Sequence, residues 1–309
     1  MKKIDSPLII ITPVYEDQKS LTRLVTIINK IYFNKVTIIA VDDGSIIHPV
    51  NNKDLTNCNV LKLKRNVGHQ MAIAIGLNFI ADKISKKSTV VVMDSDGEDD
   101  PETIKLLIED INNQNFDAVV ASRRNRNESK KFKFFYFLYK LLFKLLSGYN
   151  LNFGNFIALK YSSLQRIIGY QELTSHFAST ILFSKLRIKK IDIDRAKRYE
   201  GKSKMNFYAL VLHGFKGLSI FSDSVLVRIG IASSYFISLI VLLILIVIFL
   251  KTIGMATPGW FSIFLSLLIL ILIQTSTFIL IFLMFSDNKS LINYREHILN
   301  YIDSYETKN

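Results

Sequence analysis

The chain has 309 residues, of which 50% are hydrophobic, and a formal net charge of +13. That length allows one sizeable globular domain with apolar sequence left over. A charge of this size suits nucleic acid or an anionic membrane surface, and because no nucleic-acid-binding motif is present we exclude nucleic acid as a partner. The single cysteine, Cys58, excludes an intrachain disulfide and fits a reducing compartment.

The sequence up to Asn125 alternates short β-branched runs with longer helical patterns. Strands are predicted at residues 8–11, 36–41, 60–63, 89–93 and 118–121, with helices between them at 20–31, 69–84 and 101–112. This alternation is typical of an α/β fold with a mostly parallel sheet flanked by helices. Because ligands bind outside the carboxyl ends of such strands, we expect the loops that follow them to converge.

Two aspartates follow the predicted strand 89–93. Asp94 and Asp96 are two residues apart, so on an extended backbone their side chains face the same side. Two carboxylates placed in this way can hold Mg²⁺ or Mn²⁺, which can bridge the oxygens of a diphosphate leaving group. A solvated turn is the alternative for such a triplet, but its place at a strand end favours a metal site.

A second acidic pair, Asp42 and Asp43, follows the predicted strand 36–41. A carboxylate there can accept hydrogen bonds from a nucleotide base or ribose, and Gly44 lets the backbone approach a ligand closely. A simple turn is the alternative.

Further acidic residues follow the metal pair. Asp100 before Pro101 is typical of a helix N-terminus, which leaves Glu98 and Asp99 to face the ligand. If the reaction deprotonates a hydroxyl, a general base is needed, and Asp99 is the candidate.

Basic residues in two later segments supply donors for phosphate oxygens. A solvated basic face is the alternative for any one of them, but two phosphorylated substrates would need several. The residues are Arg123, Arg124, Arg126, Arg198, Lys202 and Lys204.

The segment 130–148 interleaves phenylalanine and leucine with lysine. It is too basic to span a membrane, and its composition is typical of an amphipathic helix in the headgroup region. A helix packed on the globular core with snorkelling lysines is the alternative. Beyond it the pattern predicts strands at 156–159 and 188–193 and helices near 162–168 and 206–217.

Two long apolar runs follow, from Ile229 to Leu250 and from Thr252 to Ser286, and neither contains a charged residue. Each exceeds the roughly 20 residues that cross a bilayer as a helix. They predict a transmembrane hairpin over 229–286, with spans at about 229–250 and 259–285; two buried helices of a soluble domain are the alternative. Basic residues on both flanks predict that both flanks are cytoplasmic.

These features divide the chain into four parts. We predict a cytoplasmic catalytic domain over 1–200, a basic juxtamembrane loop and helix over 201–228, the hairpin, and a cytoplasmic tail over 287–309. The apolar run near the N-terminus is too short for a signal peptide. We therefore expect a multi-pass protein of the inner or cytoplasmic membrane, with the catalytic domain and both termini in the cytoplasm.

Six motifs in this order and spacing resemble the family-2 glycosyltransferases with a GT-A fold. Within that family they are most similar to the polyprenyl-phosphate glycosyltransferases, the group of dolichyl-phosphate mannose synthase and bacterial undecaprenyl-phosphate glucosyltransferases. The resemblance covers nearly the whole chain. The motifs are Pro13-Val14-Tyr15, Asp42-Asp43-Gly44-Ser45, Arg65-Asn66-x-Gly68-His69-Gln70 with Ala72 and Gly76, Met93-Asp94-x-Asp96-x-x-Asp99-x-Pro101-Glu102, Ser122-Arg123-x-x-Arg126 and Arg198-x-x-Gly201-x-Ser203-Lys204.

The resemblance implies a role for each matching residue. The nucleotide sugar is expected at Pro13, Tyr15, Asp17, Asp42, Asp43, Arg65, Gly68, Asp94 and Ser95. The acceptor phosphate is expected at Arg123, Arg126, Arg198, Ser203 and Lys204. Asp96, Asp99 and Arg126 are the expected catalytic residues, and Asp94 and Asp96 the expected ligands of Mg²⁺ or Mn²⁺.

The chain departs from the family pattern at three places. Glu16-Asp17 stands where Asn-Glu is usual, and Gly97-Glu98 where Leu-Gln is usual. Gly154-Asn155-Phe156-Ile157 replaces a Gly-Asp-Phe-Arg pattern, so a carboxylate and a guanidinium are both missing. A lipid phosphate is already a nucleophile at neutral pH, so the missing carboxylate need not abolish transfer to such an acceptor.

The resemblance thus predicts an inverting, metal-dependent transfer of a sugar, most simply glucose, from a UDP-sugar to undecaprenyl or another polyprenyl phosphate at the cytoplasmic membrane face. Transfer to a glycolipid or polysaccharide hydroxyl is an alternative, as are a nucleotidyltransferase and a non-catalytic scaffold that binds nucleotide sugar or lipid. A homo-oligomer is left open.

Overall fold

The computed structural model describes residues 4, 7–32, 35–112, 115–123, 130–194, 196–200, 207–255, 257, 259–285 and 294–307. The chain forms two compact units. The first, here called the sheet unit, comprises Met1–Lys140, Asn150–Ile220 and Leu291–Asn309. The second, here called the helical unit, comprises Leu141–Tyr149 and Phe221–Ser290.

The sheet unit is built on an eight-stranded sheet with the order β7-β5-β6-β4-β1-β2-β3-β8 among the described residues. Strands β1 to β4 are mutually parallel and β7 is parallel to β5, whereas β6 and β8 run antiparallel to their neighbours. The strands are β1 (Leu8–Val14), β2 (Val36–Asp42), β3 (Cys58–Leu63), β4 (Thr89–Val92), β5 (Ala118–Arg123), β6 (Phe153–Lys160), β7 (Ile188–Ile193) and β8 (Ile302–Glu306).

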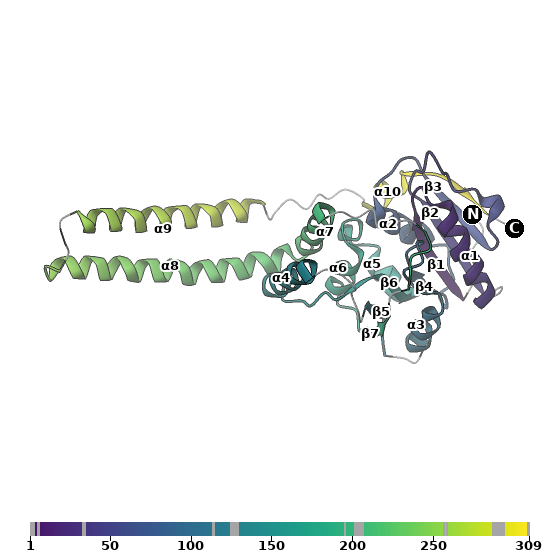
Figure 1. Cartoon of the computed structure of the whole chain (residues 1–309), viewed down its shortest axis with the longest axis horizontal. Helices are drawn as coiled ribbons and strands as arrows, with labels where there is room; N and C mark the ends of the chain where they lie inside the picture. The colour runs from purple at the N-terminus through teal and green to yellow at the C-terminus, as the bar shows by residue number, and fades with distance from the viewer. Residues whose placement is uncertain are drawn as a thin grey trace. The chain divides into compact units, whose positions relative to one another are not determined.

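Helices cover both faces of this sheet (Figure 1). On one face, α1 (Gln18–Tyr32) and α3 (Thr103–Asn112) pack apolar side chains against β1, β2 and β4. The other face is covered by α2 (His69–Ile80), α5 (Tyr161–Ile167), α6 (Phe177–Phe183) and α10 (Tyr294–Leu299). The central strands read as near-continuous apolar runs because both of their faces are buried. The predicted α/β class is therefore confirmed.

The five predicted strands of the N-terminal half all form, and their loops leave the same edge of the sheet. The helix predicted over 69–84 ends at Ile80, where the Lys83 amide donates to the Ile80 carbonyl and closes a turn. The helix predicted from Pro101 begins at Thr103, after a turn in which the Glu102 amide donates to the Asp100 carboxylate.

The sequence pattern did not reveal several short elements or the direction of β6. The predicted strand 156–159 lies inside β6, which inserts antiparallel between β4 and β5. Two 3₁₀ turns, η1 (Asn52–Asp54) and η2 (Gln171–Thr174), and helix α6 were not predicted. They are three to seven residues long, too short for a periodic pattern.

The C-terminal segment differs from the expected tail. Residues 294–306 form α10, which packs on α2, and β8, which pairs with the edge strand β3 through partners such as Leu61 and Tyr305. The Lys62 ammonium pairs with Glu306 at 2.6 Å, and the Lys64 ammonium donates to the Asn300 carbonyl. The end of the chain thus belongs to the sheet unit.

Two amphipathic helices, α4 (Lys130–Ser147) and α7 (Phe207–Ser219), match the predicted segments 130–148 and 206–217. In the sheet unit they meet where the Tyr139 ring lies against Gly214, at which a Cβ atom would approach the ring to 2.7 Å. Phe137 on α4 and Phe215 on α7 are each 65% exposed. Both helices thus present apolar side chains to their surroundings.

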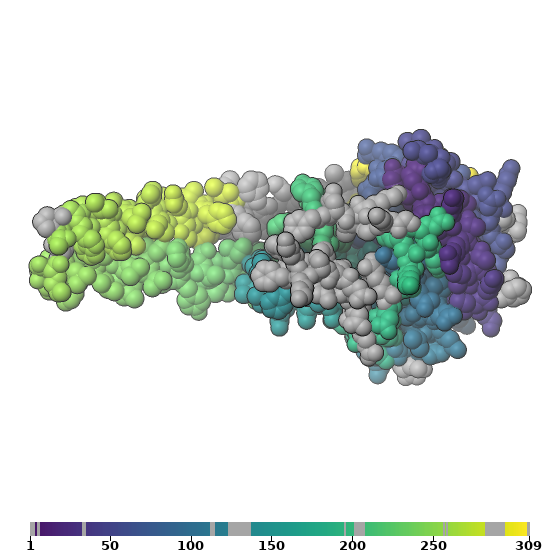
Figure 2. All heavy atoms as spheres, viewed as in Figure 1, coloured from purple at the N-terminus to yellow at the C-terminus, as the bar shows by residue number. Residues whose placement is uncertain are grey.

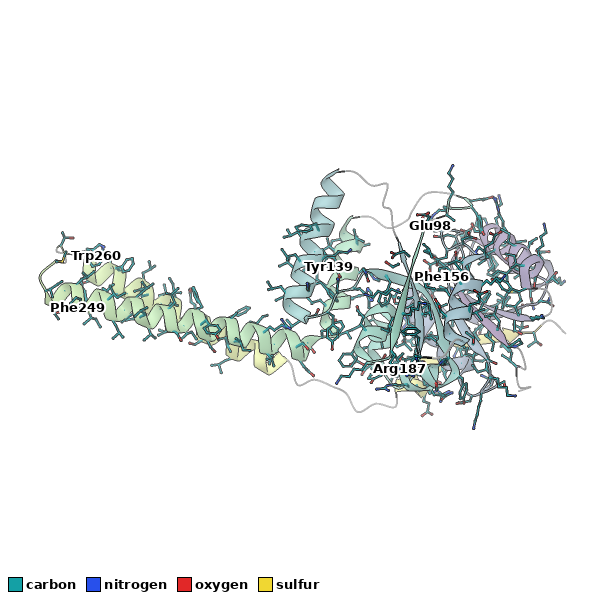
Figure 3. All side chains as sticks on the ribbon, turned by 90° about the horizontal axis from the view of Figure 1, so that it is seen from below. Glu98, Tyr139, Phe156, Arg187, Phe249 and Trp260 are labelled. Carbon is teal, nitrogen blue, oxygen red and sulfur yellow. The ribbon has the colours of Figure 1, made fainter. Side chains whose placement is uncertain are left out.

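The helical unit contains α8 (Ser222–Thr252) and α9 (Trp260–Phe285), which pack along their length through Ile240, Val247 and Leu268 (Figure 2). Both are long and apolar enough to cross a membrane. In the most apolar stretch of each helix, only 11% of α8 and 6% of α9 is buried. The two helices are therefore largely exposed in the described structure, unlike the buried core helices of the alternative. In Figure 3, Phe249 and Trp260 lie at the end of the pair where α8 connects to α9.

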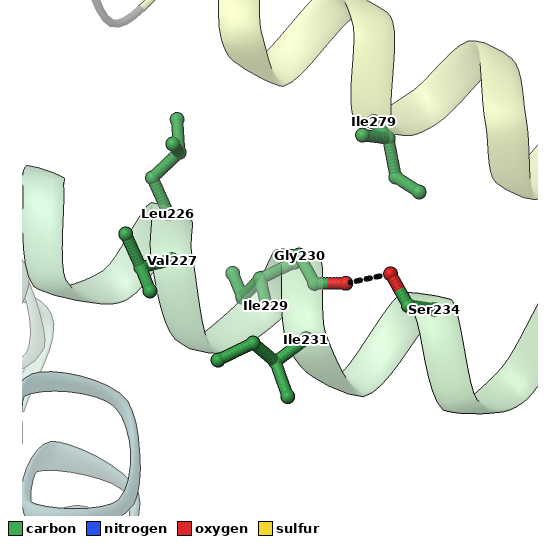
Figure 4. Close-up of a pocket in the computed structure, with 7 residues that line it drawn as sticks. All are labelled: Leu226, Val227, Ile229, Gly230, Ile231, Ser234 and Ile279. Atoms are coloured by element: carbon green, nitrogen blue, oxygen red, sulfur yellow. Dashed lines mark hydrogen bonds between the residues drawn. The ribbon is translucent and has the colours of Figure 1, made fainter.

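Two further features belong to the helical unit. The Arg228 guanidinium donates to the Leu145 carbonyl at 3.3 Å and so caps the end of α4 on the first turns of α8. An apolar pocket lies beside α8 and α9, lined by residues that include Leu226, Gly230 and Ile279 (Figure 4). Among the described residues, those that line this pocket include no carboxylate.

Candidate active site

Glu16, in the loop that follows β1, connects this loop to the loop that follows β2. Its amide donates to the Ser45 hydroxyl, and its carboxylate accepts from the amides of Ile46, Ile47 and His48 at 2.6–3.0 Å. Burial raises the pKa of Glu16, but these three amides lower it more, so the net pKa lies below the ordinary value. Glu16, a departure from the family pattern, thus holds the two loops together.

Asp42 and Asp43 are buried and hold the loops that surround them. The Asp42 carboxylate accepts from the amides of Ser45 and Val50, both at 3.1 Å. The Asp43 carboxylate accepts from the amides of Val67 and Gly68 at 2.7 and 3.0 Å, which connects the loops after β2 and β3. Burial raises the pKa of Asp43. Both carboxylates thus shape the expected nucleotide loops.

Gly44 explains how closely these loops approach. It has a φ of +69°, and a Cβ atom there would lie 2.4 Å from the Arg65 backbone. Only glycine suits such a position. Gly44 is thus a point of close backbone approach, but the group that approaches it in the structure is the neighbouring loop, whereas the expectation was a ligand.

The remaining predicted nucleotide residues of these loops lie at the same edge. Pro13 is in β1, and Tyr15 just beyond it is 44% exposed. Asp17 accepts from the Ser20 amide and so caps α1. The Arg65 guanidinium lies 5.1 Å from the centre of the Tyr301 ring and donates to the Tyr301 hydroxyl. Tyr301, from the C-terminal segment, was not anticipated at this edge.

Asp94 and Asp96 follow β4 and are partly buried, with side chains 25% and 18% exposed. Asp96 accepts from the Glu98 amide through Oδ1 and from Arg198 through Oδ2. Burial and the neighbouring Asp94 carboxylate raise the pKa of Asp96, as expected for two carboxylates that share one region. Ser95 between them is buried.

Asp99 is 2% exposed, and its Oδ2 accepts from the Asp94 amide at 3.0 Å. This contact fixes the backbone that carries the metal pair. The burial leaves little of the carboxylate accessible to a sugar hydroxyl, so the geometry favours a structural role over the predicted catalytic one.

A network that the sequence did not reveal connects Asp94 to β6. The His69 Nε2 atom lies 3.1 Å from Asp94 Oδ1 and 3.0 Å from the Asn155 amide nitrogen. The Gln70 side chain donates through Nε2 to Asn155 Oδ1 at 3.3 Å. Its Oε1 atom accepts from the Phe177 backbone amide at 2.6 Å. The third departure from the family pattern, Asn155, therefore lies beside the metal pair.

The His69 imidazole is the titratable group of this network. Burial lowers its pKa, but the Asp94 carboxylate, helped by Asp96 and Asp43, raises it more, so the net pKa lies above the ordinary value. His69 occurred in the quoted motif, but only the contact between α2 and β6 places it next to Asp94 and Asn155.

The second departure, Gly97-Glu98, contacts the segment that carries Arg198. The Arg198 Nη2 atom lies 2.7 Å from Asp96 Oδ2, and its Nε atom lies 3.4 Å from Glu98 Oε1. Glu98 lies in the sheet unit with Phe156 of β6 (Figure 3). The predicted phosphate ligand Arg198 therefore contacts the predicted metal ligand Asp96.

The other predicted phosphate residues cannot be placed. Arg124, Arg126, Lys202, Ser203 and Lys204 lie outside the described residues. Arg123 ends β5 at the carboxyl edge, but its side chain is not described.

The donor set fits a hard divalent cation. Among the described residues, no group of three or more His, Cys, Asp or Glu side chains could hold a metal ion. Two carboxylates that leave most coordination positions to phosphate oxygens and water are typical of Mg²⁺ sites. Asp94 and Asp96 thus suit a cation that is shared with a diphosphate.

A family model identifies the class of protein to which this fold and these carboxylates belong. The model described as glycosyl transferase family 2 matches residues 9–178, so the chain belongs to that family. The protein is a glycosyltransferase with a GT-A fold.

Curated relatives and solved structures agree with this assignment. The uncharacterized glycosyltransferase sll0501 of Synechocystis is 27% identical over 84% of each chain. The uncharacterized glycosyltransferase YkoT of Bacillus subtilis is 26% identical over 72% of this chain and 69% of its own. Glucosyl-3-phosphoglycerate synthase from Mycobacterium tuberculosis in complex with UDP has a TM-score of 0.51 at 13% identity, covering 71% of this chain and 80% of its own, which shows a shared fold.

Proposed function

We propose that this glycosyltransferase transfers a sugar from a UDP-sugar to a polyprenyl phosphate at the cytoplasmic face of a membrane. The observation that carries the proposal concerns the described carboxylates of the metal pair and its surroundings, each of which already has a hydrogen bond or ion pair. These carboxylates are Asp42, Asp43, Asp94, Asp96, Glu98 and Asp99. An acceptor hydroxyl needs a proton acceptor, whereas a phosphate oxyanion does not. This arrangement favours an acceptor that is already an anion.

The way in which the helical unit is connected supports a lipid acceptor. Helix α7 before α8 and helix α10 after α9 both belong to the sheet unit, so the chain leaves that unit, forms two long apolar helices and returns. If α8 and α9 cross a bilayer, both connections lie on one face of it. The catalytic residues are then tethered to the surface at which a polyprenyl phosphate presents its headgroup.

Asp94 and Asp96 would hold Mg²⁺ or Mn²⁺, which when bound neutralises the departing diphosphate. Asp99 fixes the Asp94 backbone, and His69, which Asn155 contacts, lies against the Asp94 side chain. Arg198 lies beside Asp96 and can donate to a phosphate oxygen of the acceptor. Displacement at the anomeric carbon by that oxygen inverts its configuration.

The donor is proposed as UDP-glucose. Glucosyl-3-phosphoglycerate synthase has also been solved with Mn²⁺ and UDP-glucose, with a TM-score of 0.50 and 12% identity to this chain. That likeness concerns the fold, so it only sets the order in which donors are tested.

The test is transfer of labelled sugar to undecaprenyl phosphate in detergent by the full-length protein. A panel of UDP- and GDP-sugars is offered with Mg²⁺, Mn²⁺ or EDTA. We compare wild type with Asp96→Asn and with Asp54→Asn, which makes the same change at an exposed residue of η1. We expect an acid-labile lipid product that EDTA abolishes, that falls at least about 100-fold in Asp96→Asn, and that Asp54→Asn leaves unchanged.

Two other results would redirect the proposal. Product on a glycolipid or polysaccharide hydroxyl, but not on the lipid phosphate, would favour the alternative acceptor. Measurable UDP binding with no product from any donor would favour a scaffold.

A further inference from the structure

The segment Ala196–Glu200 lies along the loop that carries the metal pair. The Ala196 amide donates to the Glu98 carbonyl at 3.2 Å, and the Tyr199 amide donates to the Asp96 carbonyl at 2.8 Å. Two backbone hydrogen bonds thus place Arg198, which lies between these donors, directly at the metal loop.

Packing of Tyr199 reinforces this placement. A Cβ atom at Gly97, which has a φ of +86°, would lie 2.6 Å from the Tyr199 ring. The Arg23 guanidinium lies 4.7 Å from the centre of the same ring. Gly97 therefore makes room for Tyr199, and a larger residue there would push the segment away from the metal loop.

The Arg198 guanidinium bridges two carboxylates in a partly buried position. It lies 2.7 Å from Asp96 and 3.4 Å from Glu98. The Arg198 side chain is 24% exposed, that of Asp96 18% and that of Glu98 13%. Charge-assisted hydrogen bonds are stronger when water is partly excluded. These contacts are therefore more than a surface ion pair.

A cation at Asp96 and this guanidinium compete for the same carboxylate. Asp96 Oδ1 accepts the Glu98 amide and Oδ2 accepts Arg198, so a cation that binds through Oδ2 meets the positive charge of the guanidinium at that oxygen. A hydrogen bond to a charged group corresponds to roughly a tenfold or larger factor in an equilibrium constant. The guanidinium should weaken cation binding by about that factor.

We propose that Arg198 is an internal counter-ion of Asp96 that the divalent cation displaces, and that Glu98 keeps the displaced guanidinium at the site, where it takes the acceptor phosphate. The role of Arg198 toward the acceptor phosphate rests on the proposed function and deepens it. The competition between Arg198 and the cation does not depend on that function. By linkage, a phosphate that draws Arg198 away from Asp96 strengthens cation binding by the same factor by which the cation strengthens phosphate binding. The enzyme would then bind the acceptor phosphate more tightly when the cation is in place, and the cation more tightly when the acceptor phosphate is bound.

The proposal also accounts for one departure from the family pattern. In Gly97-Glu98, glycine admits the Tyr199 ring and glutamate supplies the second anchor for Arg198. The two substitutions therefore act on the same segment.

The first experiment measures Mn²⁺ binding by the full-length protein in detergent, from the electron paramagnetic resonance signal of free Mn²⁺. It is run without nucleotide and again with saturating UDP, and no acceptor is present. We expect Arg198→Gln to bind Mn²⁺ about tenfold more tightly than wild type while transferring sugar more slowly. Arg23→Gln removes a nearby charge that stacks on Tyr199, so it is the control and should shift binding by less than about twofold.

The outcomes separate specific competition from general charge. Unchanged or weaker Mn²⁺ binding in Arg198→Gln would overturn the proposal, and so would an equal gain in Arg23→Gln. Binding by no variant would also overturn it. Arg198→Lys, which keeps the charge but not the two-pronged contact, should fall between wild type and Arg198→Gln, and circular dichroism of each variant checks folding.

A double-mutant cycle tests Glu98. Glu98→Gln removes a negative charge near the cation and should weaken Mn²⁺ binding in the Arg198→Gln background. In the wild-type background it also loosens Arg198, which offsets part of that loss, so the change should be smaller. Equal changes in both backgrounds would show that Glu98 does not act through Arg198. Because Mn²⁺ binding is measured without acceptor, a failure of sugar transfer leaves this result interpretable.

Discussion

Asn155 is a departure from the family pattern that lies beside the predicted metal pair. The motif comparison marks it as a place where a carboxylate is usual, and the structure puts its amide 3.0 Å from His69, which lies 3.1 Å from Asp94. The Phe177 amide fixes the orientation of Gln70, which in turn orients Asn155. A neutral side chain at this point limits the negative charge beside the metal pair.

Replacing Asn155 with aspartate tests this arrangement. The added carboxylate should raise the pKa of His69 further, because a negative neighbour favours the charged imidazolium. Since the pKa of His69 is already above its ordinary value, the imidazole should stay protonated to a higher pH in Asn155→Asp than in wild type. The measurement is a pH titration of the His69 resonance by NMR.

His69→Gln identifies that resonance. Asn51→Asp, at an exposed residue that caps η1, is the matched control and should leave the titration unchanged. An identical His69 titration in wild type and Asn155→Asp would show that the two side chains do not interact in solution.

The sequence predicts some of these residues better than others. Asp94 and Asp96 could be predicted because a strand followed by alternating acids is a local pattern. The contact of His69 with Asn155 could not, because it joins residues 86 positions apart through the antiparallel insertion of β6, which no local pattern encodes. Likewise, burial of Asp99 depends on the fold of its whole loop.

At the scale of elements, α2 packs closely on the sheet. Gly76 lies where α2 meets β1 and β2, and a Cβ atom there would lie 2.8 Å from Val41 and 3.0 Å from Ile11. Both neighbours are fully buried β-branched side chains, so they have little room to move.

Gly76→Ala should therefore destabilise the protein. Alanine gains about 1 kcal/mol over glycine in a helix interior, but overpacking costs about 1–3 kcal/mol. We expect a net loss of about 1 kcal/mol, measured as a lower Tm by circular dichroism in detergent. Gly169→Ala has no atom within 4 Å of the added Cβ and should leave Tm nearly unchanged; a Tm at or above wild type in Gly76→Ala would contradict the packing argument.

The elements themselves were predicted unevenly for physical reasons. The buried parallel strands and the long helices have strong periodic or continuous apolar patterns, and they form as predicted. Strand β8 is five residues long and half polar, because it lies at the edge of the sheet, so its sequence resembles that of a tail.

For the whole molecule, the proposed topology predicts which residues face each side of the membrane. Cys58, the only cysteine of the sequence, is buried, which gives a clean background for labelling. Lys19→Cys and Asp303→Cys, both exposed on the sheet unit, should react with an impermeant maleimide only after the membrane is opened. Met255→Cys, at the connection between α8 and α9 and 72% exposed, should react in intact cells.

Labelling of residue 303 and residue 19 from opposite sides would contradict the topology, because both belong to one folded unit. Labelling of all three positions only after opening would show that the hairpin does not cross.

Strand β8 also imposes an order on biosynthesis. The edge strand β3 is made early, but its partner, residues 302–306, leaves the ribosome only after both apolar helices. Until then the nascent sheet has an open edge that can pair with another chain. If the proposed hairpin inserts into a membrane, it does so before the sheet is complete, and a polypeptide stalled within α9 would carry a sheet unit that is still prone to aggregation.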